Sequence, residues 1–281
     1  MANTVDLHIH TTASDGADSP EALLEKLKKA GITTFSVTDH DTIDGALEME
    51  ALVTEEFRFV RGIEFSCETP AGKCHILGYD YNPHDPVFRA ALAEGAALRQ
   101  EKLLSRLSFL ETTLGITFTD AERAWIFSLK SPGKPHFGKI LVDRGIAPSI
   151  DVAIQKYINP HKPRRDRIEG HTAVKAILQA GGIPVWAHPL GGEGEQRLTA
   201  AQFQAQLDYL MGQGIRGLEC HYSRYRTAER EFLVNQAKTC GLLISGGSDY
   251  HGANKRDLPL GRLSSDDTCV DPDSLTILQK V

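Results

Sequence analysis

The stretch Val5-Asp6-Leu7-His8-Ile9-His10-Thr11 is a short apolar run that ends in two histidines. Side chains two positions apart on a strand share a face, so His8 and His10 are predicted to point the same way. Further apolar runs of strand length recur at Thr34–Thr38, Phe59–Phe65, His75–Tyr79, Ile183–Ala187, Ile215–Glu219 and Leu242–Ser245. With Val5–His8, the sequence therefore predicts seven strands.

Helical patterns separate most of these runs, which is typical of a parallel sheet in an α/β fold. The first helix has clear boundaries, with Ser19 as N-cap, Pro20 at its first position and Gly31 at its end. Later helices are predicted at Thr172–Ala180, Thr199–Gln213 and Thr227–Thr239.

The strand pattern stops between residues 84 and 170. Leucines recur from Leu103 to Leu114 at spacings of four and three, which predicts an amphipathic helix that ends at Gly115. Further helices are predicted after the capping box of Thr119 and Glu122, at Phe137–Arg144 and at Asp151–Ile158. We therefore expect a helical insertion, residues 84–170, within a domain formed by residues 1–83 and 171–281.

This insertion contains a basic segment, although the chain as a whole is acidic. Thirty-one Lys and Arg against 37 Asp and Glu give a net charge of −6, which argues against general binding to nucleic acid or to an anionic membrane. Residues 130–167 nevertheless contain nine Lys or Arg and three Asp. An anionic ligand is therefore expected to be attracted locally.

Length and cysteine content limit the class of protein. The 281 residues suit one large domain, or a barrel that carries an insertion. Five cysteines without a CxxC pair favour a reducing compartment. Residues 1–10 lack the features of a secretion signal, and no apolar run approaches the length of a membrane span. We expect a cytoplasmic protein without membrane association, and the sequence predicts no protein partner.

Histidines and acids recur where the predicted strands end. His40 follows the second strand, Glu64 lies at the end of the third and His188 follows the fifth. In a barrel the carboxyl ends of the strands meet at one mouth. Nine side chains are therefore expected to face a common volume: His8, His10, Asp15, His40, Glu64, His75, His188, Asp249 and His251.

Such a cluster predicts a metal site. Three buried carboxylates would repel one another and six imidazoles would compete for charge, which costs several kcal/mol for each unpaired ion. Divalent cations remove this cost, and nine ligands are too many for one tetrahedral ion. We expect two or three divalent ions, with Mn²⁺ as the first choice and Zn²⁺ or Fe²⁺ as alternatives.

These segments resemble the motifs of the polymerase and histidinol phosphatase (PHP) family. The segments are Val5–Thr11, Asp15-Gly16, Thr38–Asp41, Glu64, Ala187–Pro189 and Gly247–His251. The resemblance implies a distorted seven-stranded (β/α)7 barrel with an inserted helical cap and up to three metals. It also implies three ligand sets: His8, His10, Glu64 and Asp249; Glu64, His75 and His188; and Asp15, His40 and His251.

The charge of this site favours phosphoester hydrolysis. Three carboxylates and three divalent ions leave roughly +3 in a site of low dielectric, which suits a phosphate ester and a hydroxide supplied by the metals. The sequence lacks GxSxG, HExxH and GxxxxGK[ST]. A rival interpretation takes Asp39-His40-Asp41-Thr42 as an aspartyl-phosphate motif with Asp39 as the nucleophile, but it leaves the other histidines without a role.

Within the family, PHP proteins of this length with an insertion at this point resemble the nucleoside 3′,5′-bisphosphate phosphatases. The expected reaction removes the 3′-phosphate and leaves a nucleoside 5′-monophosphate. The insertion is expected to cover the mouth of the barrel, with Lys134, Pro135 and His136 of the turn Ser131–His136 binding the 5′-phosphate, helped by Arg99 and Lys102. His221, after the sixth strand, is a candidate acid for the leaving group.

Three other functions fit the sequence. A 5′-to-3′ exoribonuclease on short RNA would need aromatic stacking, for which Trp125, Phe127, Phe137 and Tyr157 are candidates that suit a core equally well. A histidinol phosphatase would need an acidic pocket for an amine, where this chain has Lys134. A metal-dependent nucleotide-binding module without turnover would have no open coordination position.

Overall fold

The structure is a computed structural model that describes residues 4–129, 132–163, 165–191, 197–263 and 268–281. It divides into two compact units, the first formed by residues 1–95 and 168–281 and the second by residues 96–167. Residues 84–95, which were expected to belong to the insertion, pack with the first unit.

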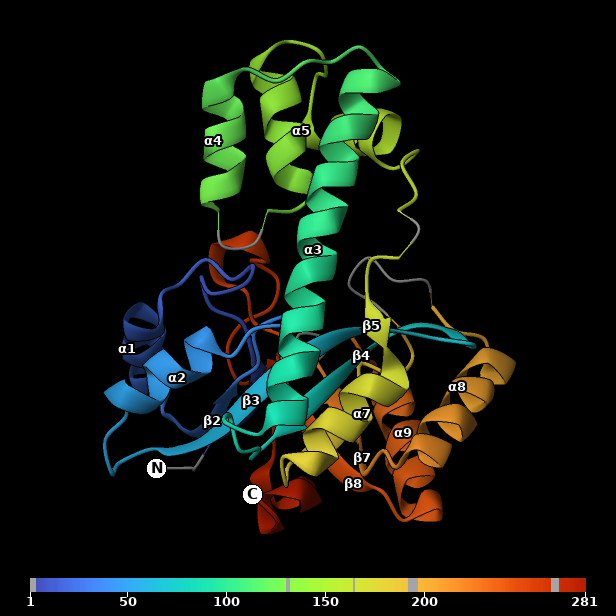
Figure 1. The fold of residues 1–281 in the computed structure, drawn as a ribbon. Coiled ribbons are helices and arrows are strands. Elements are labelled where there is room, and N and C mark those ends of the chain that lie inside the picture. The colour runs from blue at the N-terminus through green and yellow to red at the C-terminus, as the bar shows by residue number, and fades with distance from the viewer. Residues whose placement is uncertain (1–3, 130–131, 164, 192–196, 264–267) are drawn as a thin grey trace. The chain divides into compact units, whose positions relative to one another are not determined.

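Seven strands of the first unit form one sheet that is nearly closed into a barrel (Figure 1). Their order in the sheet is β1 (Thr4–Ile9), β2 (Ile32–Val37), β3 (Arg58–Thr69), β4 (Gly72–Tyr79), β6 (Ile183–Ala187), β7 (Gly217–Tyr222) and β8 (Leu243–Gly247). A short β5 (Ile168–Glu169) pairs with β3. Just beyond β8, Tyr250 forms a parallel bridge to Ile9 of β1, and its carbonyl oxygen accepts the N–H of His10 at 2.9 Å. The predicted α/β barrel of seven strands is confirmed.

The parallel arrangement that the alternation of strands and helices indicated does not hold at β4. This strand is antiparallel to both of its neighbours, β3 and β6. Only Pro70 and Ala71 separate Thr69, the end of β3, from Gly72, the start of β4. So short a connection permits a hairpin, whereas parallel strands need a crossover of a dozen or more residues.

Helices cover the outside of the sheet (Figure 1). They are α1 (Pro20–Ala30), α2 (Asp44–Leu52), α7 (Gly170–Gln179), α8 (Ala200–Gln213) and α9 (Thr227–Cys240). As predicted, the Ser19 side chain accepts the N–H of Ala22, and Gly31 ends α1 in the left-handed conformation, with φ of 71°. Helix α2 was not predicted from the sequence, because it has no side-chain cap and buries few apolar residues.

The remaining short elements of the first unit lie near the end of the chain. They are the 3₁₀ helices Gly252–Asn254, Pro272–Ser274 and Thr276–Gln279 and the antiparallel strands β9 (Arg262–Leu263) and β10 (Thr268–Cys269).

The second unit is helical and has its own core. The long α3 (Pro86–Thr112) begins in the first unit and is followed by α4 (Asp120–Ser128), α5 (Lys134–Asp143), α6 (Ile150–Ala153) and a π-helix (Ile154–Ile158). The expected capping box of Thr119 and Glu122 is present. The buried core residues are Leu103, Leu107, Leu110, Phe118, Ile126, Phe137, Ile140 and Ile158. Leu114 follows the end of α3 and is exposed, so the apolar stripe ends one turn earlier than predicted.

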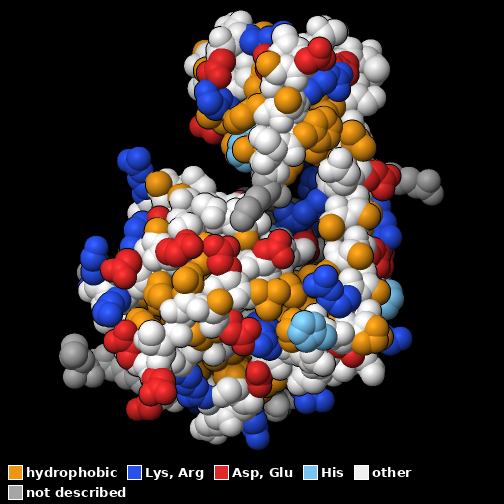
Figure 2. All heavy atoms as spheres, turned by 60° about the vertical axis from the view of Figure 1, so that its left-hand side comes forward, with side chains coloured by type: hydrophobic (Ala, Val, Ile, Leu, Met, Phe, Trp, Pro, Cys, Tyr) orange, Lys and Arg blue, Asp and Glu red, His pale blue; other side chains and the backbone are white. Residues whose placement is uncertain are grey.

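Acidic and basic side chains are interspersed on the face of the molecule in Figure 2. Among the described residues, no helix combines the length and apolar character that crossing a membrane requires.

Candidate metal centre

All nine side chains predicted to face a common volume lie together in the first unit, in three overlapping groups. Within each group, one potential ligand atom from every residue lies within 4.8 Å of those of the others. His8 belongs to β1 and His10 follows it directly, so strand alternation brings both imidazoles to the inside of the barrel. Both side chains are fully buried.

The first group consists of His8, His10, Glu64 and Asp249. The His10 Nε2 atom lies 3.2 Å from Glu64 Oε2 and 3.2 Å from Asp249 Oδ1. The corresponding distances from His8 Nε2 are 3.3 and 3.5 Å. Two nitrogens and two oxygens thus converge, as in a mixed imidazole and carboxylate site for a divalent ion.

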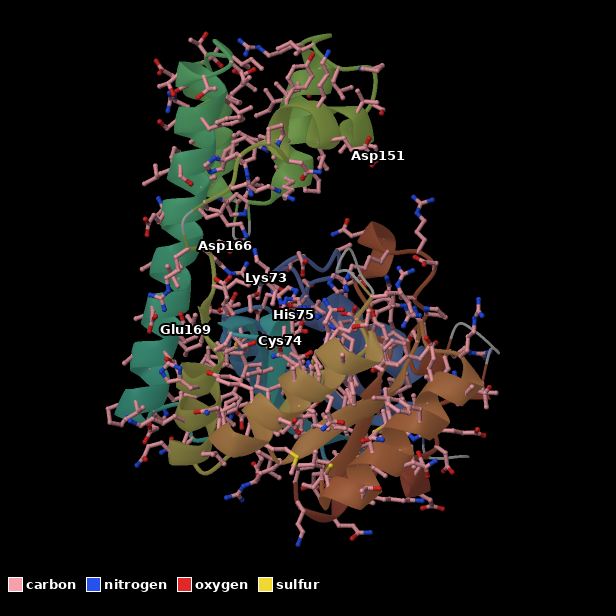
Figure 3. All side chains as sticks on the ribbon, turned by 90° about the vertical axis from the view of Figure 1, so that its right-hand side faces the viewer. Lys73, Cys74, His75, Asp151, Asp166 and Glu169 are labelled. Carbon is pink, nitrogen blue, oxygen red and sulfur yellow. The ribbon has the colours of Figure 1, made fainter. Side chains whose placement is uncertain are left out.

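The second group consists of Glu64, His75 and His188. The other carboxylate oxygen of Glu64, Oε1, lies 3.2 Å from His75 Nδ1 and 3.1 Å from His188 Nε2. Glu64 therefore presents one oxygen to each of two groups. His75 follows Lys73 and Cys74 along β4 (Figure 3), and the alternation of the strand sends the buried Cys74 to the opposite face.

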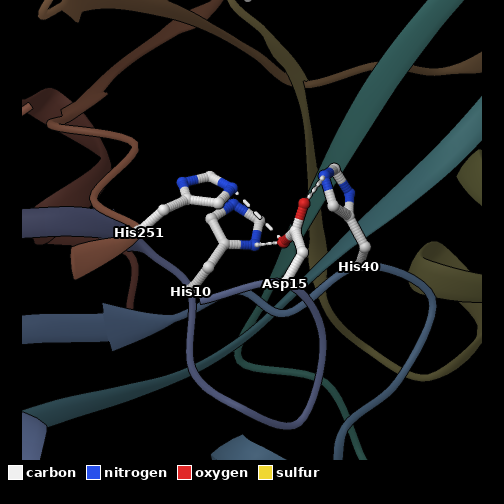
Figure 4. A group of neighbouring side chains, drawn as sticks. All are labelled: His10, Asp15, His40 and His251. Carbon is white, nitrogen blue, oxygen red and sulfur yellow. Dashed lines mark ion pairs between the residues drawn. The ribbon is translucent and has the colours of Figure 1, made fainter. Parts of the chain in front are cut away.

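The third group surrounds Asp15, on the loop after His10 (Figure 4). Asp15 Oδ1 lies 3.3 Å from His251 Nε2 and 3.6 Å from His10 Nδ1, and Oδ2 lies 4.0 Å from His40 Nε2. His10 thus adds to the set that the resemblance implied here. Asp15 is exposed over 43% of its side chain, which makes this group the solvent-accessible side of the centre.

Unsatisfied polar atoms show that the cluster suits metal ions. His8 Nε2, His10 Nε2, His40 Nδ1, Glu64 Oε2 and His251 Nε2 are buried and form no hydrogen bond with any described residue. Native proteins rarely leave so many polar atoms without partners in one place. The His8, His10 and Glu64 atoms face one another in the first group, and the His251 atom faces Asp15 in the third, so the donor set fits divalent cations.

Interactions between charged side chains within the cluster shift the pKa values of its histidines and carboxylates. Burial disfavours the charged form of His8, but the carboxylates of Glu219, Glu64 and Asp249 raise its pKa well above the ordinary value. Burial acts likewise on His10, and contacts with Asp249 and Glu64 raise its pKa to about 9. Burial would raise the pKa of Asp15, but His40 and His251 lower it well below its usual range. Without metal, protons therefore balance the carboxylates.

Comparison with known proteins identifies the family. A family model described as PHP domain matches residues 6–243. The chain belongs to the PHP family. This PHP protein is 28% identical over 264 residues to a 3′,5′-nucleoside bisphosphate phosphatase from Chromobacterium violaceum, covering 92% of this chain and 91% of the relative. It is also 28% identical over 255 residues to a 5′-3′ exoribonuclease from Haemophilus influenzae, covering 89% and 91%.

A solved structure shares the fold. A Chromobacterium violaceum amidohydrolase with bound sulfate and no metal has a TM-score of 0.79 and 25% identity, over 99% of this PHP chain and 95% of that chain.

Two further carboxylates, Glu219 and Asp39, support the ligand groups by hydrogen bonds. The sequence prediction did not include Glu219, and it considered Asp39 only as a nucleophile. Glu219 of β7 is fully buried and hydrogen-bonded to His8 Nδ1 and to the backbone N–H of His188. Asp39 accepts hydrogen bonds from the Thr11 N–H, the Thr11 hydroxyl and the Ser14 hydroxyl, and so fixes the loop that carries Asp15. The signal for Glu219 was an acid at the end of the apolar run Ile215–Glu219.

His221 does not join the centre of this PHP protein. It lines a surface pocket with residues of α9, including Arg230 and Lys238, that belong to none of the three groups. A register shift between Glu219 and His221 explains the error, because a bulge cancels the rule that residues two apart share a face.

The residues predicted to bind the second phosphate all lie in the second unit. The Lys134 ammonium donates to Asn159 Oδ1 at 2.7 Å, and Lys102 pairs with Asp166 at 2.8 Å. His136 Nδ1 accepts the N–H of Gly133 at 2.9 Å, so that N–H is already used within the turn. Pro135 lies in the first turn of α5, Arg99 lies on α3, and Ser131 falls outside the described residues.

The candidate stacking residues have different environments. Phe137 is fully buried in the core, and Trp125 and Tyr157 pack against it. Phe127 is 44% exposed.

Proposed function

We propose that this protein is a metal-dependent phosphatase that hydrolyses the 3′-phosphate of nucleoside 3′,5′-bisphosphates and leaves nucleoside 5′-monophosphates. The observation that carries the proposal is the convergence of six imidazoles and three carboxylates in three groups joined by Glu64 and His10.

Divalent ions held by these groups would supply positive charge to the phosphate oxygens and lower the pKa of water. The chain contributes the positions of the ligands. Glu64 divides its two oxygens between two groups, and His10 is shared by the first and the third. The exposed Asp15 and the partly exposed His40 and His75 mark the side from which a phosphate ester would approach.

The environment of Asp39 argues against the aspartyl-phosphate alternative. Its side chain is 1% exposed, and its two oxygens accept three hydrogen bonds from Thr11 and Ser14. A nucleophilic carboxylate needs an oxygen that can reach phosphorus. Asp39 therefore suits a structural role, and water is the nucleophile in our proposal.

The substrate is inferred from the relatives and from the basic segment. The relative from Chromobacterium violaceum is named for bisphosphate hydrolysis and matches almost the whole chain. The sulfate in the related solved structure is a tetrahedral oxyanion like phosphate. We assign binding of the 5′-phosphate to Lys134, Pro135 and His136, with Arg99 and Lys102. Lys134 and Lys102 would exchange their present partners, Asn159 and Asp166, for phosphate oxygens.

A second candidate function is 5′-to-3′ hydrolysis of short RNA. The relative from Haemophilus influenzae, at the same identity, is named for that activity. Of the four candidate stacking residues, Phe127 has the exposed ring that stacking on a base requires.

Phosphate release in the presence of Mn²⁺ separates these functions. Adenosine 3′,5′-bisphosphate, histidinol phosphate and a short 5′-phosphorylated RNA would be compared at equal concentration, with the nucleotide product identified. We expect the highest kcat/KM for the bisphosphate, with the 5′-monophosphate as product. A preference for RNA or for histidinol phosphate would overturn the assignment.

A further inference from the structure

Glu219 connects two of the three ligand groups without belonging to either. It lies on β7 and is fully buried. Its Oε1 atom lies 2.7 Å from Nδ1 of His8, and its Oε2 atom accepts the backbone N–H of His188 at 2.7 Å. A carboxylate can only accept hydrogen bonds, so both of these contacts must be donated by the histidines.

The contact with His8 fixes the tautomer of that ring. Because Nδ1 carries the proton that is donated to Glu219, the lone pair of the neutral ring is on Nε2. Nε2 is the atom that faces Glu64 and Asp249 in the first group, at 3.3 and 3.5 Å. Glu219 thus keeps His8 in the form that can bind a metal.

The contact with His188 fixes its backbone. His188 has a φ of 30°, a conformation that residues other than glycine rarely adopt and that the surroundings must hold in place. The hydrogen bond to Glu219 holds this N–H, and the His188 side chain then directs Nε2 into the second group. One buried carboxylate therefore acts on ligands of two groups.

We propose that Glu219 is a positioning residue that makes the first and second groups competent to bind metal, through the ring of His8 and the backbone of His188. This inference rests on the proposed metal-dependent function. The third group contains neither His8 nor His188, so it serves as an internal reference.

The substitution Glu219→Gln tests this role because an amide cannot replace the carboxylate at both contacts. If its NH₂ faces His8, Nδ1 must accept, which places the proton on Nε2 and removes that ligand. If its NH₂ faces His188, two buried donors oppose each other. Glu219→Asp keeps the charge, but its side chain is one methylene too short to reach both partners. This variant replaces Glu219→Gln in the test if Glu219→Gln does not fold. Glu229→Gln is the charge-matched control, since Glu229 pairs with Arg197 and belongs to none of the groups.

Metal binding is the readout, measured by titration calorimetry with Mn²⁺ and by anomalous scattering from Mn²⁺-soaked crystals. For Glu219→Gln we expect affinity at the first and second groups to fall by about 10- to 100-fold, with the third group still occupied. The unfolding midpoint of chelator-treated protein reports separately on any purely structural effect.

Unchanged occupancy in all three groups, or an equal loss in all three, would overturn the role of Glu219. Absence of metal from the unsubstituted protein would instead refute the proposed function, so the two failures are distinguishable.

Discussion

Asp249 Oδ1 lies 3.2 Å from Nε2 of His10, although the two residues come from opposite ends of the chain. The contact forms where β1 meets the segment after β8, at the point where the barrel nearly closes. Closure of the fold and assembly of the first ligand group are therefore the same structural event. Mutations where β1 contacts the segment after β8 are expected to affect both the stability of the protein and its metal binding.

Asp6 connects β1 to the segment after β8 by hydrogen bonds, without being one of the potential metal ligands. Its Oδ1 accepts the N–H groups of His8 and Ser248, and its Oδ2 accepts the Ser248 hydroxyl and the N–H of Gly261. Asp6→Asn must turn its NH₂ toward one of these buried donors, so we expect metal-free protein to lose about 1–3 kcal/mol of unfolding free energy. Urea denaturation measures this loss. Asp143→Asn, which removes the carboxylate of the exposed pair with Lys139, is expected to cost less than about 1 kcal/mol. Equal losses in the two variants would contradict the role given to Asp6.

Asp39 is expected to support the third group. In Asp39→Asn, the amide leaves a donor of Thr11 or Ser14 without an acceptor, which loosens the loop that carries Asp15. We expect Mn²⁺ affinity at that group to fall about tenfold or more, whereas the second group keeps its metal. Anomalous scattering from soaked crystals measures each occupancy.

The same residue tests the rival chemistry. If Asp39 were a nucleophile, rapid quenching with ³²P-labelled substrate would trap a phosphoenzyme that is absent from Asp39→Asn. Our account predicts that no phosphoenzyme is trapped in either protein.

Metal affinity should rise with pH. The pKa of His10 is about 9 in the metal-free protein, against an ordinary value of 6.5. The native state therefore holds a proton on His10 that the unfolded chain releases between these values, so the contribution of His10 to metal-free stability is fully present below pH 6.5 and is lost as pH rises through about 9. Metal must displace this proton, so its apparent affinity should rise about tenfold per pH unit for each proton displaced. Calorimetry in buffers of different ionisation enthalpy counts the protons released, and release of none would contradict the coupling.

Lys134 is expected to distinguish bisphosphates from simple monoesters. Lys134→Ala should raise KM for adenosine 3′,5′-bisphosphate by about tenfold, because a charge-assisted contact to phosphate is lost, with little change for a monoester that has no second phosphate. Lys139→Ala is the matched control on the same helix, where the exposed Lys139 pairs with Asp143. Steady-state kinetics give KM for both substrates. An equal rise of KM for the bisphosphate and for the monoester in Lys134→Ala would exclude a contact with the second phosphate.

The position of the ligand cluster was predictable because the residues concerned follow apolar runs. His8 and His188 lie at or just beyond strand ends, so a barrel brings them together whatever the details of its loops. Glu64 was expected at the end of the third strand, but β3 continues to Thr69, so Glu64 lies inside that strand. Register within a strand was less predictable. The bulge between Glu219 and His221 turns His221 away from the face on which Glu219 contacts the centre, and apolar periodicity does not indicate a single inserted residue. The antiparallel β4 was decided by the two-residue turn after Thr69 rather than by its own composition.

The central claim is that these side chains hold divalent ions without which no phosphate ester is hydrolysed. The most direct test measures phosphate release from adenosine 3′,5′-bisphosphate before chelation, after exhaustive dialysis against a chelator, and after Mn²⁺ is restored. We predict that activity disappears in the second state and returns in the third. Full turnover by protein shown to be free of metal would contradict the account.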